Sequence, residues 1–189
     1  LPGDVILSWS GSLGDHLFTP HPATWLRPGQ EAFAAFCDQV RPAFEREGRT
    51  LCIHPHARHA LSDVQGCVAF LRAREGQPFG VALAPASMLT MSMLDTVEDH
   101  LTRAFETLGP LATMVILEDV RPAPTERDED ALEHVSLGEG VLPAATIRRL
   151  LDAHVPETTP VVIRAGALDR QRQWLEAGDQ CAPRNRLAQ

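Results

Sequence analysis

The chain has 189 residues, of which 44% are hydrophobic and 22% charged, and its formal net charge is −8. A chain of this size and composition forms one globular domain with a substantial core, and its excess of acids argues against a duplex nucleic-acid binder, which needs a basic face. All 17 bases are Arg and there is no Tyr. This excludes enzymes that need a Lys amine, such as Schiff-base aldolases, pyridoxal-phosphate enzymes and P-loop nucleotide hydrolases, and any chemistry with a Tyr acid or nucleophile.

Hydrophobic periodicity predicts strands that alternate with helices. Short apolar runs are typical of buried strands, whereas apolar residues at helical spacing are typical of amphipathic helices. The predicted strands are residues 4–9, 50–54, 79–84, 112–118 and 160–165. The predicted helices are residues 30–47, 63–74, 95–108, 143–154 and 168–177. We expect Pro42 to kink or divide the first helix, and residues 11–29 and 121–142 to form loops.

This order of elements predicts an α/β domain. The central strands are almost continuously apolar, as parallel strands covered on both faces should be. Strand starts recur roughly every 30–50 residues, which is typical of βαβ units with right-handed crossovers. Either a doubly wound sheet or a segment of a (βα)8 barrel satisfies the pattern. In both folds, functional residues gather at the C-terminal ends of the strands.

The ends and the cysteines of the chain add further expectations. Residues 1–11 lack the basic and apolar regions of a secretory signal, and no window has enough uninterrupted apolar residues for a membrane span. We therefore expect a cytoplasmic protein. Residue 1 is Leu, so we expect the chain to begin partway into a longer gene product. We expect one domain over residues 1–177 and a polar tail over 178–189. The four cysteines lack CxxC spacing, which favours buried free thiols over a zinc site or disulfides.

Polar residues follow the predicted strands and are the candidates for function. They are Trp9, His54, His56, Ser87, Glu118, Asp119 and Arg164. His54 fits either a catalytic role or an interior hydrogen-bonded imidazole, and His56 fits either a site or a solvated loop. Glu118 and Asp119 fit acid/base work, a surface pair or a helix cap. An Arg at the end of an apolar strand needs an anionic partner, so we expect Arg164 to meet a ligand or an ion-pair partner.

Four segments, in this order, resemble the xylose isomerase-like TIM barrels, which include sugar phosphate isomerases and epimerases and are related to apurinic endonucleases. The segments are LCIHPH (51–56), residues 59–89, VILEDV (115–120) and HVSLGEG (134–140). The resemblance places the first strand of this chain at about the fourth strand of the barrel. It implies a (βα)8 TIM-barrel type of fold, of which this chain covers about five βα units from the C-terminal part. The N-terminal strands are then missing, or another copy covers the edges of the sheet.

The family holds a divalent metal with Glu, Asp, His and Glu from consecutive strands, and this sequence departs from that pattern. The residues at or beside these positions are His54, Ala84, Ser87, Ile116, Glu118 and Arg164. Ala has no ligand atom, and the guanidinium of Arg164 would repel a cation. We therefore expect no metal and no other cofactor.

The resemblance implies an isomerase or epimerase that acts on, or binds, a small sugar or sugar acid. In this interpretation the proton carriers are His54, His56 and Glu118. The substrate-binding residues are Trp9, Arg164, His134 and Glu139. Arg164 replaces the metal electrostatically. The alternative is a non-catalytic relative that binds a carbohydrate-like ligand or a protein. We expect no nucleic-acid or membrane partner; a homo-oligomer is one way to complete the sheet. An apurinic endonuclease is disfavoured by the substituted metal positions and by the net charge of −8.

Overall fold

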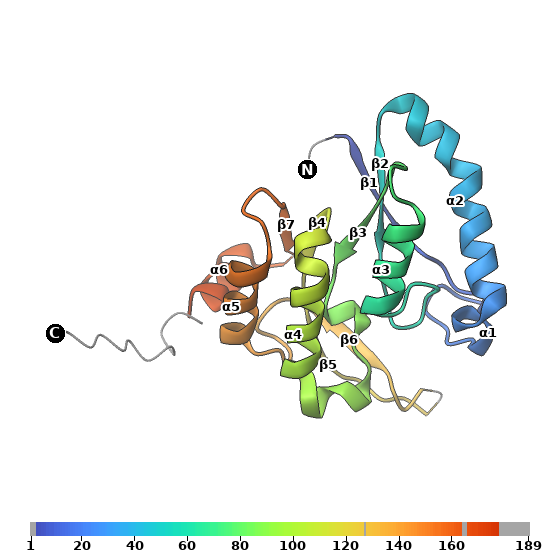
Figure 1. Cartoon of the computed structure of the whole chain (residues 1–189). Helices are drawn as coiled ribbons and strands as arrows, with labels where there is room; N and C mark the ends of the chain where they lie inside the picture. Colours follow the sequence, from blue (N-terminus) through green and yellow to red (C-terminus); the bar gives the residue numbers. More distant parts are fainter. Residues whose placement is uncertain (1–2, 127, 164–165, 178–189) are drawn as a thin grey trace.

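The structure of the protein is a computed structural model that describes residues 3–126, 128–163 and 166–177. Its centre is a sheet of five parallel strands in the order β1-β2-β3-β4-β7, so each strand lies beside the next one of the sheet along the chain (Figure 1). The strands are β1 (Val5–Trp9), β2 (Thr50–His54), β3 (Phe79–Leu83), β4 (Met114–Leu117) and β7 (Val161–Ile163).

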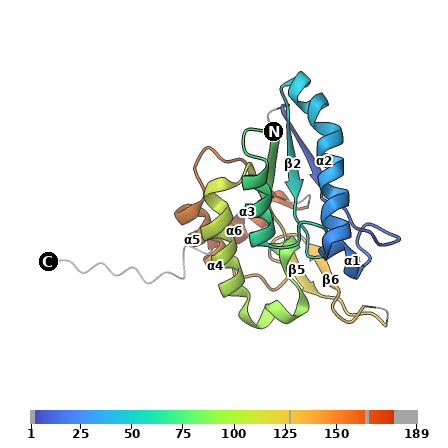
Figure 2. The ribbon, with the colours of Figure 1, turned by 45° about the vertical axis from the view of Figure 1, so that its right-hand side comes forward.

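Helices connect consecutive strands and cover one face of the sheet. They are α1 (Pro22–Trp25), α2 (Arg27–Glu47), α3 (Val64–Ala73), α4 (Val97–Leu108), α5 (Ala144–His154) and α6 (Leu168–Ala177). From α2 to α5 they follow one another in chain order around the outside of the sheet (Figures 1 and 2). Sequential parallel strands with all crossovers on one side form a curled half-barrel. This arrangement excludes the doubly wound sheet, which has helices on both faces.

Both faces of the strands are apolar, and each has its own cluster. The register pairs Ile53 with Val81 on the face towards the helices, where the large hydrophobic core forms. On the inner face of the half-barrel, Cys52, Ala82 and Met114 belong to a second buried cluster. The C-terminal ends of the strands open at one end of this inner face.

The helix α2 runs through Pro42 without a break, so of the two expected effects of the proline, a kink or a division, division is excluded. Two predicted loops also contain regular structure. The predicted loop over 11–29 contains α1 and the first residues of α2. The predicted loop over 121–142 contains most of an antiparallel hairpin of β5 (Asp119–Pro122) and β6 (Leu132–Val135). The hairpin lies at the end of the sheet where the strands end (Figure 1). It was missed because β5 follows β4 after a single residue, and its Pro and charged residues are typical of loops.

The expected strands, helices and buried thiols are confirmed within the described residues. All five predicted strands and the five helices between and after them are present, with shifts of a few residues at their ends. Cys37, Cys52 and Cys67 are free and buried. No helix in the described part of the chain is both long and apolar enough to cross a membrane. Cys181, Arg164 and the predicted polar tail over 178–189 lie outside the described residues.

Candidate active site

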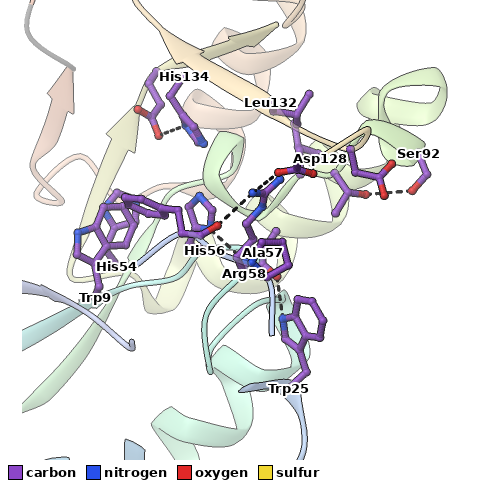
Figure 3. A pocket seen from close by; sticks show the side chains of 16 residues that line it. Trp9, Trp25, His54, His56, Ala57, Arg58, Ser92, Asp128, Leu132 and His134 are labelled. Carbon is purple, nitrogen blue, oxygen red and sulfur yellow. Dashed lines mark hydrogen bonds and ion pairs between the residues drawn. The ribbon is translucent and has the colours of Figure 1, made fainter. Parts of the chain in front are cut away.

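A cavity of about 750 Å³ opens at the C-terminal ends of the strands, beneath the β5–β6 hairpin. Strand ends, the loop after β2 and the hairpin all contribute to its wall (Figure 3). The lining residues used below are Trp9, Phe18, His54, His56, Arg58, Glu118, Asp128 and His134. A concave site of this size, with convergent polar groups, matches the cavities in which proteins bind small molecules.

A carboxylate and an imidazole form a pair at the inner end of this cavity. Glu118 follows β4 directly, and the antiparallel hairpin pairs Val120 with His134. This fold-back brings Nδ1 of His134 to 2.8 Å from Oε1 of Glu118. Because an ionised carboxylate only accepts hydrogen bonds, Nδ1 carries the proton. The other ring nitrogen, Nε2, is therefore the one with a free lone pair for a ligand.

Glu118 also accepts a second hydrogen bond, from a buried serine. Ser87 Oγ donates to Glu118 Oε1 at 2.8 Å, and the same Oγ lies 2.9 Å from Nε2 of His54. Since the single hydroxyl proton goes to the carboxylate, the Ser87 oxygen accepts and His54 Nε2 carries a proton. Ser87 and His134 thus both donate to the Glu118 carboxylate, and His54 donates to Ser87. Ser87 is 1% exposed, so it holds the network rather than meeting a ligand.

His54 is a neutral, tightly packed member of this network. Its ring stacks on Trp9 with centroids 3.9 Å apart, and only 6% of the residue is exposed. Burial lowers the pKa of His54 to about 4, although the negative charge of Glu118 opposes this shift. At neutral pH the imidazole is therefore uncharged. Its role is to orient Ser87 and to support the indole of Trp9, which faces the cavity.

His56 has a different partner. Its Nδ1 accepts a hydrogen bond from the backbone N–H of Arg58 at 3.1 Å. Its ring lies beside those of Phe18 and His134, with centroid distances of 4.9 and 5.5 Å. Burial is the main cause that lowers the pKa of His56 to about 3.

An ion pair closes the outer wall of the cavity. The guanidinium of Arg58 lies 2.5 Å from the Asp128 carboxylate and donates to the carbonyl of Phe18 at 3.1 Å. It therefore links the loop after β1, the loop after β2 and the tip of the hairpin. Figure 3 shows Arg58 and Asp128 on either side of this contact. His59 secures the same region, because its Nε2 donates to the Leu17 carbonyl at 2.9 Å. These contacts place Phe18 against the histidines.

Asp119 is a structural residue. It is completely buried, and its carboxylate accepts four backbone N–H groups of Val120, Gly138, Gly140 and Leu142 at 2.8–3.1 Å. The glycines of the HVSLGEG segment are needed for this packing. A Cβ at Gly140 would lie 2.3 Å from Asp119, and Gly138 has a φ of +84° against the ring of Trp174. The motif is thus a backbone cradle for a carboxylate.

Several solved structures share this fold. No protein-family model matches the sequence, and no curated protein is significantly similar to it. A xylose isomerase domain protein from Planctomyces limnophilus matches 94% of this chain with a TM-score of 0.60 and 14% identity. The 3-keto-D-glucoside 4-epimerase from E. coli matches 93% with a TM-score of 0.59 and 16% identity. A xylose isomerase-like TIM barrel protein from Mycobacterium smegmatis, in complex with magnesium, matches 93% with a TM-score of 0.53 and 8% identity.

The chain has the fold of the xylose isomerase-like TIM barrels. It spans 60%, 63% and 61% of the length of these three structures, which agrees with a barrel segment of five strands. At these identities the similarity establishes the fold, and the chemistry must be argued from the side chains of this chain.

Most of the site residues predicted from the sequence lie together. Trp9, His54, His56, Glu118 and His134 all line the cavity. Glu139 does not, and the prediction that it binds substrate there disagrees with the structure. It lies in the Asp119 cradle segment, is half-exposed, and lies 3.9 Å from the guanidinium of Arg170. Arg164 lies outside the described residues, so its expected role stays a prediction.

Sequence reasoning did not predict the outer wall of the cavity. Phe18 and Asp128 come from the predicted loops over 11–29 and 121–142, and Arg58 comes from the connection behind the second strand end. No local pattern marks them, because the ion pair joins residues 70 positions apart in the sequence. The sequence places Ser87 near a strand end and beside a family metal position, but its link to Glu118 needs the three-dimensional register of β3 and β4.

The described residues do not fit the divalent metal that this barrel family holds. Among them, no group of three His, Cys, Asp or Glu side chains is placed to bind a metal ion. Nε2 of His54 is occupied by Ser87, and Ala84 offers no ligand atom. Oε1 of Glu118 already accepts from Ser87 and His134. The site chemistry is therefore derived below from protein groups alone.

Proposed function

We propose that the protein is an isomerase or epimerase of small sugars or sugar acids, which moves a proton on the carbon next to a carbonyl group. The observation that carries this proposal is the Glu118–His134 pair, with 2.8 Å between carboxylate and imidazole, at the wall of a ligand-sized cavity. A carboxylate-oriented histidine is a frequent general base. The epimerase named among the similar structures supports the same class of chemistry.

The lining of the cavity supports a sugar-like ligand. Trp9 and Phe18 form an aromatic wall, with ring centroids 5.4 Å apart, and such surfaces pack against the apolar face of a sugar ring. The histidines supply hydrogen-bonding groups for hydroxyl and carbonyl oxygens. The Arg58 charge is paired with Asp128, so the described wall offers no unpaired cation for a phosphate group.

The proton transfer follows from the orientation of His134. Nε2 removes a proton from the carbon beside the carbonyl; the C–H electron pair forms the new C=C bond, and the carbonyl π pair moves onto oxygen. Glu118 stabilises the imidazolium that results. Delivery of a different proton, from water, to the other face of the same carbon gives the epimer, and His134 then releases its proton to solvent. Return of the removed proton to the former carbonyl carbon instead, with transfer of the neighbouring hydroxyl proton to the other oxygen, gives the aldose–ketose isomer.

Proton exchange with solvent tests this function directly. Wild-type protein is incubated in D2O with a panel of aldoses, ketoses, keto-sugars and sugar acids, and deuterium incorporation is followed by NMR. We expect exchange at one carbon beside the carbonyl of at least one compound. Replacement of Glu118 by Gln removes the charge that supports His134, and should lower the rate by about 10²–10⁴.

Glu139→Gln is the matched control, because it makes the same chemical change outside the cavity. It should leave the exchange rate unchanged. Absence of exchange with the whole panel, or equal loss in both variants, contradicts the proposal.

A non-catalytic ligand-binding relative is the second candidate. The absence of a metal-binding group among the described residues supports it, because a barrel that has lost its metal can keep its cavity. Calorimetry separates the two functions: saturable sugar binding without any deuterium incorporation identifies a binding protein.

Partners and location stay proposals. The outer strands expose apolar residues, with Ile6 and Leu7 of β1 at 40% and 44% and Val161 of β7 at 46%. This exposure supports a cover over the sheet edges, either by further strands or by a second copy of the chain. We also propose a cytoplasmic location. Size-exclusion chromatography with light scattering measures whether this chain is a homo-oligomer.

A further inference from the structure

Two histidines stand side by side on the cavity wall with opposite partners. His134 donates from Nδ1 to a carboxylate, whereas His56 accepts at Nδ1 from a backbone N–H. An imidazole that accepts at Nδ1 must be neutral and must carry its proton on Nε2. A protonated His56 would turn two N–H groups towards each other at this contact. The backbone of Arg58 therefore fixes both the charge and the tautomer of His56.

We propose that His56 acts as a neutral hydrogen-bond donor, whose Nε2–H binds the carbonyl oxygen of the ligand and stabilises the negative charge that develops there when His134 removes the proton. This inference rests on the proposed function. It assigns to an imidazole the stabilisation that a metal ion would otherwise supply, and it replaces the role of proton carrier that the sequence suggested for His56.

The geometry brings base and donor to one ligand. The rings of His56 and His134 have centroids 5.5 Å apart and both line the cavity. Neighbouring atoms of one carbonyl compound can therefore meet both. Oxyanion stabilisation needs a donor that is already in place and shielded from water. His56 satisfies this condition, because it is 8% exposed and held between the backbone of Arg58 and the ring of Phe18.

The surroundings of His56 keep it neutral. The titratable or charged groups that face it are His59, His134, His54 and Arg58. A positive charge on any of these groups disfavours a second positive charge on His56. Together with burial, they place the pKa of His56 at about 3. When His134 becomes an imidazolium during proton transfer, this neighbour disfavours protonation of His56 further, so His56 keeps its role throughout the reaction.

Histidine-selective ¹⁵N NMR tests the tautomer without any substrate. Spectra are recorded in the presence of EDTA between pH 5 and 8, and His56 is assigned by the signals missing from His56→Gln. We expect one protonated nitrogen, Nε2, across the whole range. A doubly protonated ring at the acidic end of this range, or a proton on Nδ1, overturns the proposal.

Exchange kinetics test the role. His56→Ala should reduce the kcat for deuterium exchange by about 10²–10³, the usual cost of removing one oxyanion donor. His56→Gln keeps an N–H donor and should recover at least tenfold over His56→Ala. The exposed His16→Ala is the control and should match wild type. Equal rates for His56→Ala and wild type overturn the proposal. So does an alkaline loss of wild-type activity that is absent from His56→Gln, because it would show a charged acid.

The two proposals fail separately. If wild-type protein exchanges no sugar proton, the proposed function is wrong, and so is the catalytic role of His56. The NMR spectra then still show whether His56 is a neutral donor. If exchange occurs but His56 is charged, only the present inference fails.

Discussion

The buried carboxylate of Asp119 should be one of the most important single groups for stability. One oxygen accepts from the N–H groups of Val120 and Leu142, at 2.8 and 3.0 Å. The other accepts from Gly138 and Gly140, at 3.1 and 3.0 Å. Asp119→Asn replaces one oxygen by an NH₂ group, which faces two N–H donors in either orientation. Two hydrogen bonds to a charged group are lost, at roughly 1.5–3 kcal/mol each. The free energy of unfolding should therefore fall by about 3–6 kcal/mol.

Urea denaturation followed by far-UV circular dichroism measures this change. The matched control is Asp152→Asn on α5, whose carboxylate is 62% exposed and pairs with Arg148 on the helix surface at 2.9 Å. Exposed pairs of this kind contribute about 0–1 kcal/mol. If Asp119→Asn costs less than about 1 kcal/mol, or no more than the control, then the carboxylate is not what holds the HVSLGEG segment and the reasoning is refuted.

Three further predictions concern acid, the outer wall and the thiols. Since burial lowers the pKa of His54 and His56 from 6.5 to about 4 and about 3, the unfolded chain binds more protons below pH 6.5. The contribution of each histidine to the free energy of unfolding is then complete above that pH and falls on acidification, by about 2 kcal/mol per histidine at pH 5. A urea midpoint that is unchanged between pH 8 and pH 5 contradicts this prediction. Arg58→Gln removes the bond to Asp128 and should raise the sugar dissociation constant while costing about 1 kcal/mol of stability; calorimetry of wild type and variant compares the two effects. Burial raises the pKa of Cys67 to about 12, so this thiol should react with Ellman's reagent only in denaturant, as counted by absorbance.

The architecture was largely predictable because it depends on local patterns. Apolar runs such as residues 50–54 and 79–84 become buried parallel strands, and alternation places Trp9, His54 and Glu118 at the strand ends that line the cavity. The hydrogen bonds between them were not predictable. Ser87 meets Glu118 only through the register of two strands that are far apart in the sequence.

The motif HVSLGEG was recognised in the sequence, but the reason for its residues was not. Its resemblance to a family loop suggested that Glu139 binds substrate, but the glycines are explained by the backbone cradle around Asp119. The histidine that opens the motif, His134, is the member that reaches the cavity. A short motif indicates which residues are constrained, whereas the reason for the constraint requires the contacts.

The central claim is that His134, supported by Glu118, transfers the proton while His56 stabilises the oxyanion, without a metal ion. The most direct measurement is the rate of deuterium exchange into the best sugar of the panel, with metal-stripped protein in EDTA and again after addition of Mg²⁺, Mn²⁺ or Zn²⁺. The account predicts the same rate in every sample. Exchange that appears only after a metal is added, with one ion bound per chain, would contradict it.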